Sequence, residues 1–417
     1  MSFQFPEGFL FGVATAAHQV EGGNTNSDYW LYEHVAGSEF VEPSGQSIDH
    51  YHRYVADIEL IASLGFNCFR FSIEWARIEP AEGRFSRSAL DHYRQVLDAC
   101  HKVNIAPVVT LHHFSSPQWF IAAGGWEAEA AADRFARYCQ RVARELGDRM
   151  QIVCTVNEAN SGVLNVVTGL FGNLNHRKHA AWVAESARRL GVSPDNFSPW
   201  NFAGTSGAAE NIISAHRKAV EAMKTERPQL QVGLTVAMSD FQARTGGEER
   251  TARVRSQVED RFLDACGDDD FVGVQAYTRV LIGPDGVLPP DEGAELTQMG
   301  YEFWPEALGV SIERASQRTD LPVLVSENGI GTEDDSRRIA YVSRALAGVA
   351  DCLRNGIDVR SYICWSAFDN YEWEFGYGPK FGLVAVDRST QRRIPKPSAH
   401  WLGAIARSRT LEAPERE

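Results

Sequence analysis

Short apolar runs alternate along the chain with longer segments of helical periodicity. Eight runs are almost continuously apolar, which is typical of parallel strands buried on both faces. They cover residues 9–14, 66–72, 105–111, 152–156, 232–237, 271–276, 323–325 and 359–365. Between them, apolar residues recur at intervals of three and four, most clearly over 339–353, where the pattern ends before Gly356. Eight strand–helix repeats predict an α/β protein folded as a single (β/α)8 TIM barrel.

The length of 417 residues is compatible with two or three average domains or with one large barrel. Residues 191–207 are rich in Ser, Pro, Asn and Gly, as a linker between two domains would be. A boundary there would leave two unclosed half-barrels. We therefore expect one catalytic domain over residues 1–417, in which residues 169–208 form a long loop between a strand and its helix.

The net charge and the cysteine content limit which binding partners and which cellular compartment we expect. Lys and Arg number 41 against 55 Asp and Glu, and this net charge of −14 disfavours nucleic acid and anionic membranes and favours a small neutral or cationic ligand. No apolar stretch reaches the roughly 18 residues that span a bilayer. The first residues lack the basic region of a secretory signal. Seven cysteines without a C-x-x-C pair indicate free thiols in a cytoplasmic protein.

Two glutamates stand where predicted strands end, which is where barrel enzymes place their catalytic groups. Asn157-Glu158 follows the fourth run, and Glu327-Asn328 follows the seventh. Two carboxyl groups that flank one bond are the equipment of glycoside hydrolysis, in which one donates a proton and the other attacks or activates water. One such Glu alone could be an ordinary surface residue, but two at corresponding positions favour an active site.

Polar and aromatic residues end the other runs as well. They are Gln19, Arg70, His112, His113, Tyr277 and Trp365, followed by the DNYEW segment at 369–373. Adjacent strand residues point to opposite faces, so only one of His112 and His113 can enter the cavity. This, and the absence of an H-E-x-x-H motif, disfavours a metal site. We expect no metal and no cofactor.

With these residues and motifs, the sequence resembles glycoside hydrolase family 1, the retaining β-glucosidases and β-galactosidases. The segments that carry the resemblance are 9–22 (FLFGVATAAHQVEG), 51–80 (with LGFNCFRFSIEWARIEP), 155–158 (TVNE), 326–329 (SENG), 365–377 (WSAFDNYEWEFGY) and 395–401 (PKPSAHW). Together they extend over nearly the whole chain.

The resemblance implies a role for each matching residue. Glu327 would be the nucleophile and Glu158 the acid/base, with Arg70 and Tyr277 in contact with the nucleophile. The remaining set would hold the non-reducing sugar: Gln19, His113, Asn157, Glu372 and Trp373 around its hydroxyls, and Trp365 beneath it. Beside a cation and a phenol, Glu327 should be ionised, whereas Glu158 should be protonated. A retaining double displacement predicts carboxyl groups about 5–5.5 Å apart.

Several positions refine the substrate or depart from the family pattern. Family members that cleave 6-phosphoglycosides carry Ser where this chain has Glu372, which favours an unphosphorylated sugar. Ala159 replaces the usual Pro after the acid/base, and Gln275-Ala276 replaces the usual pattern before the catalytic Tyr. Residues 169–208 fit the family poorly and would lie near the aglycone side of the cleft. Five residues could either line that side or only pack the loop: Phe171, Asn173, Trp182, Trp200 and Phe202.

We therefore expect hydrolysis of terminal β-D-glucosyl residues from oligosaccharides or from aryl and alkyl glycosides, with β-fucosyl and β-galactosyl residues as further candidates. A mainly transglycosylating enzyme would use the same two glutamates. A non-catalytic sugar-binding protein is the alternative from another class, and a metal-dependent barrel enzyme is a third. The preferred sugar, the leaving group and the oligomeric state stay open at this stage.

Overall fold

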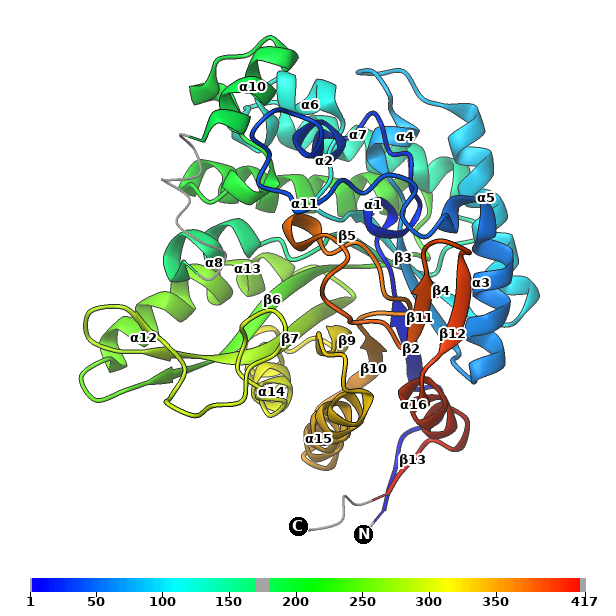
Figure 1. The fold of residues 1–417 in the computed structure, drawn as a ribbon, viewed down its shortest axis with the longest axis vertical. Helices are drawn as coiled ribbons and strands as arrows, with labels where there is room; N and C mark the ends of the chain where they lie inside the picture. Colours follow the sequence, from blue (N-terminus) through cyan, green and yellow to red (C-terminus); the bar gives the residue numbers. More distant parts are fainter. Residues whose placement is uncertain (1, 170–179, 413–417) are drawn as a thin grey trace.

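The computed structural model describes residues 2–169 and 180–412 (Figure 1). In this part of the chain, eight parallel strands form a closed barrel. They are β2 (Leu10–Ala14), β3 (Cys68–Ser72), β4 (Ala106–His112), β5 (Ile152–Val156), β6 (Gln231–Ala243), β7 (Phe271–Ile282), β9 (Val323–Asn328) and β10 (Val359–Cys364). Each pairs with its successor, and β10 pairs with β2 to close the ring. The predicted (β/α)8 barrel is confirmed, with one strand at each apolar run.

Amphipathic helices surround the strands and bury their apolar faces against them (Figure 1). The principal ones are α3 (His50–Leu64), α5 (Arg87–Lys102), α7 (Ala131–Leu146), α11 (Ser206–Glu226), α12 (Glu248–Arg255), α13 (Arg261–Leu263), α14 (Ala307–Thr319), α15 (Asp335–Arg354) and α16 (Pro397–Ser408). In α15, Val342, Leu346 and Val349 face the core, and the Asp334 side chain caps the first turn through the backbone N–H of Ser336. The stripe predicted over 339–353 is therefore the buried face of this helix.

Shorter elements lie in the connections. The helical ones are α1 (Ala17–Val20), α2 (Asp28–Glu33), α4 (Trp75–Ile78), α6 (Gln118–Ala122), η1 (Gly125–Glu127), α8 (Ser161–Thr168), α10 (Ala181–Leu190), η2 (Pro194–Asn196), η3 (Trp200–Phe202), η4 (Ser256–Asp260, a π-helix), η5 (Asp264–Cys266) and η6 (Trp373–Phe375). The extended ones are β1 (Phe3–Gln4) paired with β13 (Thr410–Leu411), β11 (Val384–Asp387) paired with β12 (Arg392–Pro395), and β8 (Val287–Leu288) paired with β7.

Strands β6 and β7 run beyond the ends predicted for them at residues 237 and 276. They stay paired from Gly233↔Phe271 to Ala243↔Ile282, and they leave the barrel as a two-stranded ribbon (Figure 1). The reason is that apolar side chains continue past the rim, with Phe241 and Ile282 both buried. This extension positions residues that line the functional cavity.

The segment 169–208 is not a bare loop. Among its described residues, α10, η2 and η3 form, and Trp182, Trp200 and Phe202 are at most 4% exposed. The Trp200 Nε1 donates a 2.8 Å hydrogen bond to the Ser161 hydroxyl. These three rings therefore pack the segment against the barrel, as the packing alternative predicts. Phe171 and Asn173 lie outside the described residues.

All seven cysteines are free and buried. Three examples are Cys100, Cys352 and Cys364, whose thiols have pKa values raised by burial to about 12. Among the described residues, no helix combines the length and the apolar character needed to cross a membrane.

Candidate active site

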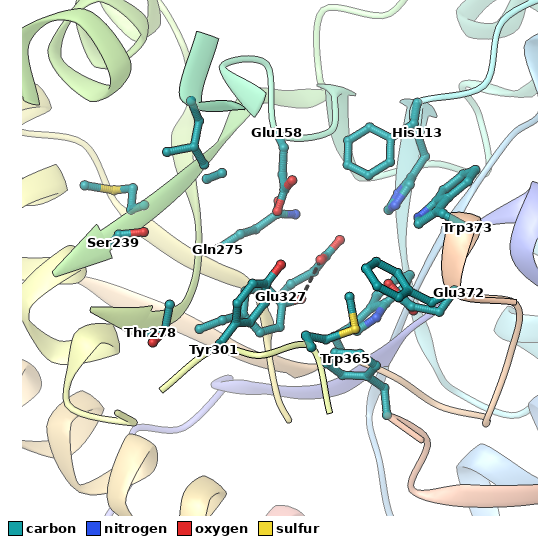
Figure 2. A pocket seen from close by; sticks show the side chains of 18 of the residues that line it. His113, Glu158, Ser239, Gln275, Thr278, Tyr301, Glu327, Trp365, Glu372 and Trp373 are labelled. Atoms are coloured by element: carbon teal, nitrogen blue, oxygen red, sulfur yellow. Dashed lines mark hydrogen bonds between the residues drawn. The ribbon is translucent and has the colours of Figure 1, made fainter. Parts of the chain in front are cut away.

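A cavity that is open at its mouth lies over the carboxyl ends of the barrel strands (Figure 2). Seven of the ten predicted site residues line it: His113, Glu158, Tyr277, Glu327, Trp365, Glu372 and Trp373. The other three, Gln19, Arg70 and Asn157, are fully buried behind its wall and reach it through hydrogen bonds. The structure thus brings all ten residues together at one site.

Glu327, near the end of β9, is held by two donors. Arg70 on β3 donates from Nη1 to the Glu327 Oε1, and the Tyr277 hydroxyl on β7 donates to the Glu327 Oε2 at 2.8 Å. Burial raises the pKa of Glu327, while the guanidinium and the phenol oppose this rise. Both donors favour the ionised carboxylate.

Glu158 follows β5 on a strained stretch of backbone. Its φ is 45°, in the left-handed region that non-glycine residues seldom adopt. Its backbone N–H donates to the Thr235 hydroxyl at 2.9 Å, and the Ala159 N–H donates to the Thr235 carbonyl at 3.0 Å. A proline at 159 would lack the second donor, so the Ala159 departure adds a tie between this turn and β6. Such strain is common at functional sites.

The two glutamates differ in how they hold a proton. The pKa of Glu158 is raised to about 8, first by burial and then by the negative charge of Glu327. Arg70 opposes this rise, and Glu372 adds to it. Glu327 receives two direct hydrogen bonds from Arg70 and Tyr277. These two bonds favour the carboxylate form of Glu327, whereas the raised pKa of Glu158 favours its protonated form at neutral pH.

Behind these groups, Asn157 is oriented by two donors from other strands. Its Oδ1 accepts hydrogen bonds from the Arg70 Nη2 at 2.5 Å and from the Gln275 Nε2 at 2.8 Å. Its Nδ2 lies 3.4 Å from the Nε2 of His113. The Asn157 amide thus presents its nitrogen, a hydrogen-bond donor, toward the His113 side of the site.

The same end of the cavity combines an amide, a carboxyl group and indole rings (Figure 2). The Gln19 Nε2 donates to the Glu372 Oε2 at 3.4 Å, and the rings of His113 and Trp365 stack with centroids 5.5 Å apart. Burial, followed by the charges of Glu327 and Glu374, raises the pKa of Glu372 to about 8. Glu372 is therefore largely neutral at pH 7, and the full negative charge that would repel a phosphorylated sugar develops only at higher pH.

The adjacent histidines separate as predicted. His113 lines the cavity, whereas His112 turns to the other side and bonds the Ser116 hydroxyl at 3.0 Å beside the ring of Trp200. Within residues 2–169 and 180–412, no three His, Cys, Asp or Glu side chains are grouped so that they could hold a metal ion.

Much of the cavity rim escaped sequence reasoning. It comprises Phe114, Leu164, Ala237, Met238, Ser239, Gln275, Thr278, Met299, Tyr301, Glu374, Phe375 and Phe381. Of these, the sequence singles out only Gln275, as a departure from the family pattern. The others come largely from the extensions of β6 and β7 and from connecting segments. The continued apolar alternation after residue 237 is the one signal that could have extended β6 to Met238 and Ser239.

Comparisons with known proteins agree with this geometry. The model of the family described as Glycosyl hydrolase family 1 matches residues 1–280 and 288–411. The chain is similar to β-glucosidase A of Thermotoga maritima, with 28% identity over 98% of this chain and 99% of the relative. It is 30% identical to a bifunctional β-D-glucosidase/β-D-fucosidase of Bifidobacterium breve, over 96% of this chain and 98% of the relative.

A solved structure gives the same result. The crystal structure of β-glycosidase BGL167 superposes with a TM-score of 0.94 at 53% identity, covering 99% of this chain and 100% of that one. Sequence and fold therefore agree over almost the full length of the chain, including both glutamate-bearing strands. The chain belongs to glycosyl hydrolase family 1.

Proposed function

We propose that the chain is a retaining β-glucosidase in which Glu327 is the nucleophile and Glu158 the acid/base. The assignment rests on the different surroundings of the two carboxyl groups in this one cavity. Glu327 accepts hydrogen bonds from Arg70 and Tyr277, whereas burial and neighbouring negative charge raise the pKa of Glu158 to about 8. Such a pair of unlike carboxyl groups meets the needs of double displacement.

In the first step, an oxygen of Glu327 attacks the anomeric carbon, and the bond to the leaving oxygen breaks. Glu158 gives its proton to that oxygen, which departs as an alcohol. In the second step, Glu158 removes a proton from water, and the water oxygen attacks the same carbon. Glu327 is released as a carboxylate, Glu158 is protonated again, and the sugar keeps its β configuration.

We assign the sugar to the end of the cavity formed by Gln19, His113, Asn157, Glu372 and Trp373, with Trp365 beneath it. Amide and carboxyl groups there can bond hydroxyls, and the indole faces can cover the flat side of a pyranose ring. β-Glucosides are the proposed substrates, with β-fucosides as a second candidate because the Bifidobacterium relative is named for both activities. β-Galactosides are a third candidate.

The test uses 4-nitrophenyl β-D-glucoside followed by proton NMR. We expect the β anomer of glucose to form first, and Glu327→Ala to abolish turnover. A 2-deoxy-2-fluoro glucoside should trap a covalent ester at Glu327, identified by mass spectrometry of its peptide. The α anomer as first product, or label at another residue, would disprove the assignment. Wild-type turnover no faster than that of Glu327→Ala would instead favour a sugar-binding protein.

Transfer to an alcohol uses the same covalent intermediate. Adding a primary alcohol to the same assay measures the ratio of alkyl glucoside to free glucose. Water as the main acceptor supports the hydrolase, and a dominant alkyl glucoside would favour a transglycosylating enzyme.

We also propose that the protein is cytoplasmic, because its seven cysteines are buried and form no disulfides, as is typical of proteins in a reducing environment.

A further inference from the structure

Gln275 has an unusual position among the groups that surround the reacting carbon. It lies on β7, opposite Glu327 on β9 and opposite Ala237 on β6. Its side chain is 1% exposed and points into the space between Glu158 and Glu327 (Figure 2). Through its Nε2 it reaches Asn157, which follows β5. The residue therefore spans the inside of the barrel from β7 to the acid/base segment.

The nitrogen and the oxygen of the Gln275 amide differ in their hydrogen bonding. Its Nε2 donates to the Asn157 Oδ1 at 2.8 Å, but its Oε1 is buried with no hydrogen-bond partner among the described residues. A buried acceptor without a partner is costly and calls for an explanation. Reversing the amide would not remove the problem, because two carbonyl oxygens, those of Gln275 and Asn157, would then face each other. In the observed orientation, the Gln275 amide therefore keeps its Nε2 hydrogen bond to Asn157 and leaves its Oε1 without a partner among the described residues.

The contact that is kept determines what Asn157 offers to a substrate. With Arg70 and Gln275 both donating to its Oδ1, Asn157 can present only its Nδ2 donor to the cavity. Arg70 also bonds Glu327, so one guanidinium holds both the attacking carboxylate and this amide. A sugar whose C1 meets Glu327 thereby brings its neighbouring C2 hydroxyl within reach of Asn157. Hydrogen bonds to that hydroxyl strengthen in the transition state of glycoside hydrolysis.

We propose that Gln275 is a positioning residue that fixes the Asn157 amide as a donor to the 2-hydroxyl of the sugar, at the cost of its own unpartnered Oε1. This inference rests on the proposed β-glucosidase function. It also accounts for the departure at this position, since an Asn on the same backbone would be one bond shorter and would not extend as far toward Asn157.

The test compares 4-nitrophenyl β-D-glucoside with its 2-deoxy analogue in Gln275→Met. Methionine fills similar volume, and the Asn157 Oδ1 keeps its bond from Arg70, so no new buried polar group is left unpaired. We expect kcat/KM to fall about five- to tenfold for the glucoside, the size of one lost hydrogen bond, and to change little for the 2-deoxy substrate. The melting temperature should stay the same or rise, because the unpartnered Oε1 is gone.

A ratio of the two kcat/KM values that equals the wild-type ratio would overturn the proposal, whatever the melting temperature. Gln275→Glu, which has similar size but an oxygen where Nε2 donates, is the second variant and should lower the same ratio. If neither variant folds, Gln275 is a structural residue and the proposal fails. In an Asn157→Ala background, Gln275→Met should cause no further change in the ratio, and an additional loss would also contradict the proposal.

Gln242→Met is the matched control. This glutamine lies on the neighbouring strand β6, bonds Asp240 and Arg279, and is outside the cavity lining. It should leave the substrate ratio at the wild-type value. A wild-type enzyme that cleaves neither substrate would refute the proposed function itself, an outcome distinct from an unchanged ratio in an active Gln275→Met variant.

Discussion

The Tyr277 hydroxyl donates a 2.8 Å hydrogen bond to the Glu327 Oε2, on the oxygen that Arg70 does not bond. Both carboxylate oxygens are thus held, and the carboxylate has a fixed orientation before substrate binds. The two donors come from β7 and β3, which lie on opposite sides of the barrel. The orientation of the Glu327 carboxylate therefore depends on the closed barrel rather than on any local sequence motif.

Removing this phenol should weaken catalysis and shift its pH dependence. Tyr277→Phe is expected to lower kcat/KM about ten- to a hundredfold, since a hydrogen bond to a charged group contributes about 1.5–3 kcal/mol. The bond lowers the pKa of Glu327, so its loss should move the acidic limb of the kcat/KM profile to higher pH. Tyr54→Phe, on the outer helix α3, is the control and should change neither quantity. An unshifted acidic limb would contradict this role.

The basic limb should report Glu158. Its pKa of about 8 predicts that kcat/KM falls as pH rises through 8, because the ionised form cannot protonate the leaving group. Glu372 ionises over the same pH range, where its charge raises the pKa of Glu158, so Glu372→Gln should move the limb to lower pH. The measurement is kcat/KM for an alkyl glucoside against pH. A limb that moves to higher pH in Glu372→Gln would exclude this coupling.

Leaving-group dependence offers a separate test of the same residue. Glu158→Gln should lower kcat/KM for an alkyl glucoside by about 10²–10⁴, the usual contribution of general acid catalysis. The loss should be much smaller for 2,4-dinitrophenyl glucoside, whose leaving group departs without a proton. Exposed Glu82→Gln serves as control and should affect neither substrate. Equal losses for both substrates would rule out Glu158 as the acid.

Stability should depend on Asp28, the first residue of α2. Burial raises the pKa of its carboxyl from 3.8 to about 7, so the folded chain holds this proton more tightly than the unfolded chain. The free energy of unfolding should therefore decrease as pH rises from 4 to 7, by up to about 1.4 kcal/mol per unit. Asn can accept the same two backbone bonds, from Tyr29 and Ser116, at Oδ1.

Asp28→Asn should flatten this slope and be more stable than the wild type at pH 8. Urea unfolding at pH 5 and pH 8 measures it, with exposed Asp351→Asn as a control that keeps the wild-type slope. A stability difference between Asp28→Asn and the wild type that is the same at both pH values would refute the prediction.

The packing role found for Trp200 can also be checked. Trp200→Phe should lower the free energy of unfolding by about 1–2 kcal/mol, because the bond to Ser161 and part of the ring contact are lost. The ratio of kcat/KM for aryl and alkyl glucosides should stay at the wild-type value. A changed ratio would instead indicate that Trp200 lines the aglycone side of the cleft.

The barrel was predictable because each strand is encoded locally, as an apolar run followed by a helical stripe. Strand ends then identified Glu158 and Glu327, and the resemblance to the family supplied roles for the other residues. What escaped prediction depends on distant contacts. Ser239 and Thr278 line the cavity because β6 and β7 support each other beyond the barrel rim. Only the assembled site reveals that Glu372 is buried near Glu327, which makes it a weak acid rather than a charged one at neutral pH.

The burial of every cysteine leaves the molecular surface without a reactive thiol. For Cys100, Cys352 and Cys364 the raised pKa also keeps the nucleophilic thiolate scarce. A single cysteine introduced at an exposed position such as Val41 would therefore be the one accessible site for maleimide chemistry, with no need to remove native cysteines first. The enzyme is in this sense already prepared for site-specific attachment of a fluorophore or for immobilisation on a support.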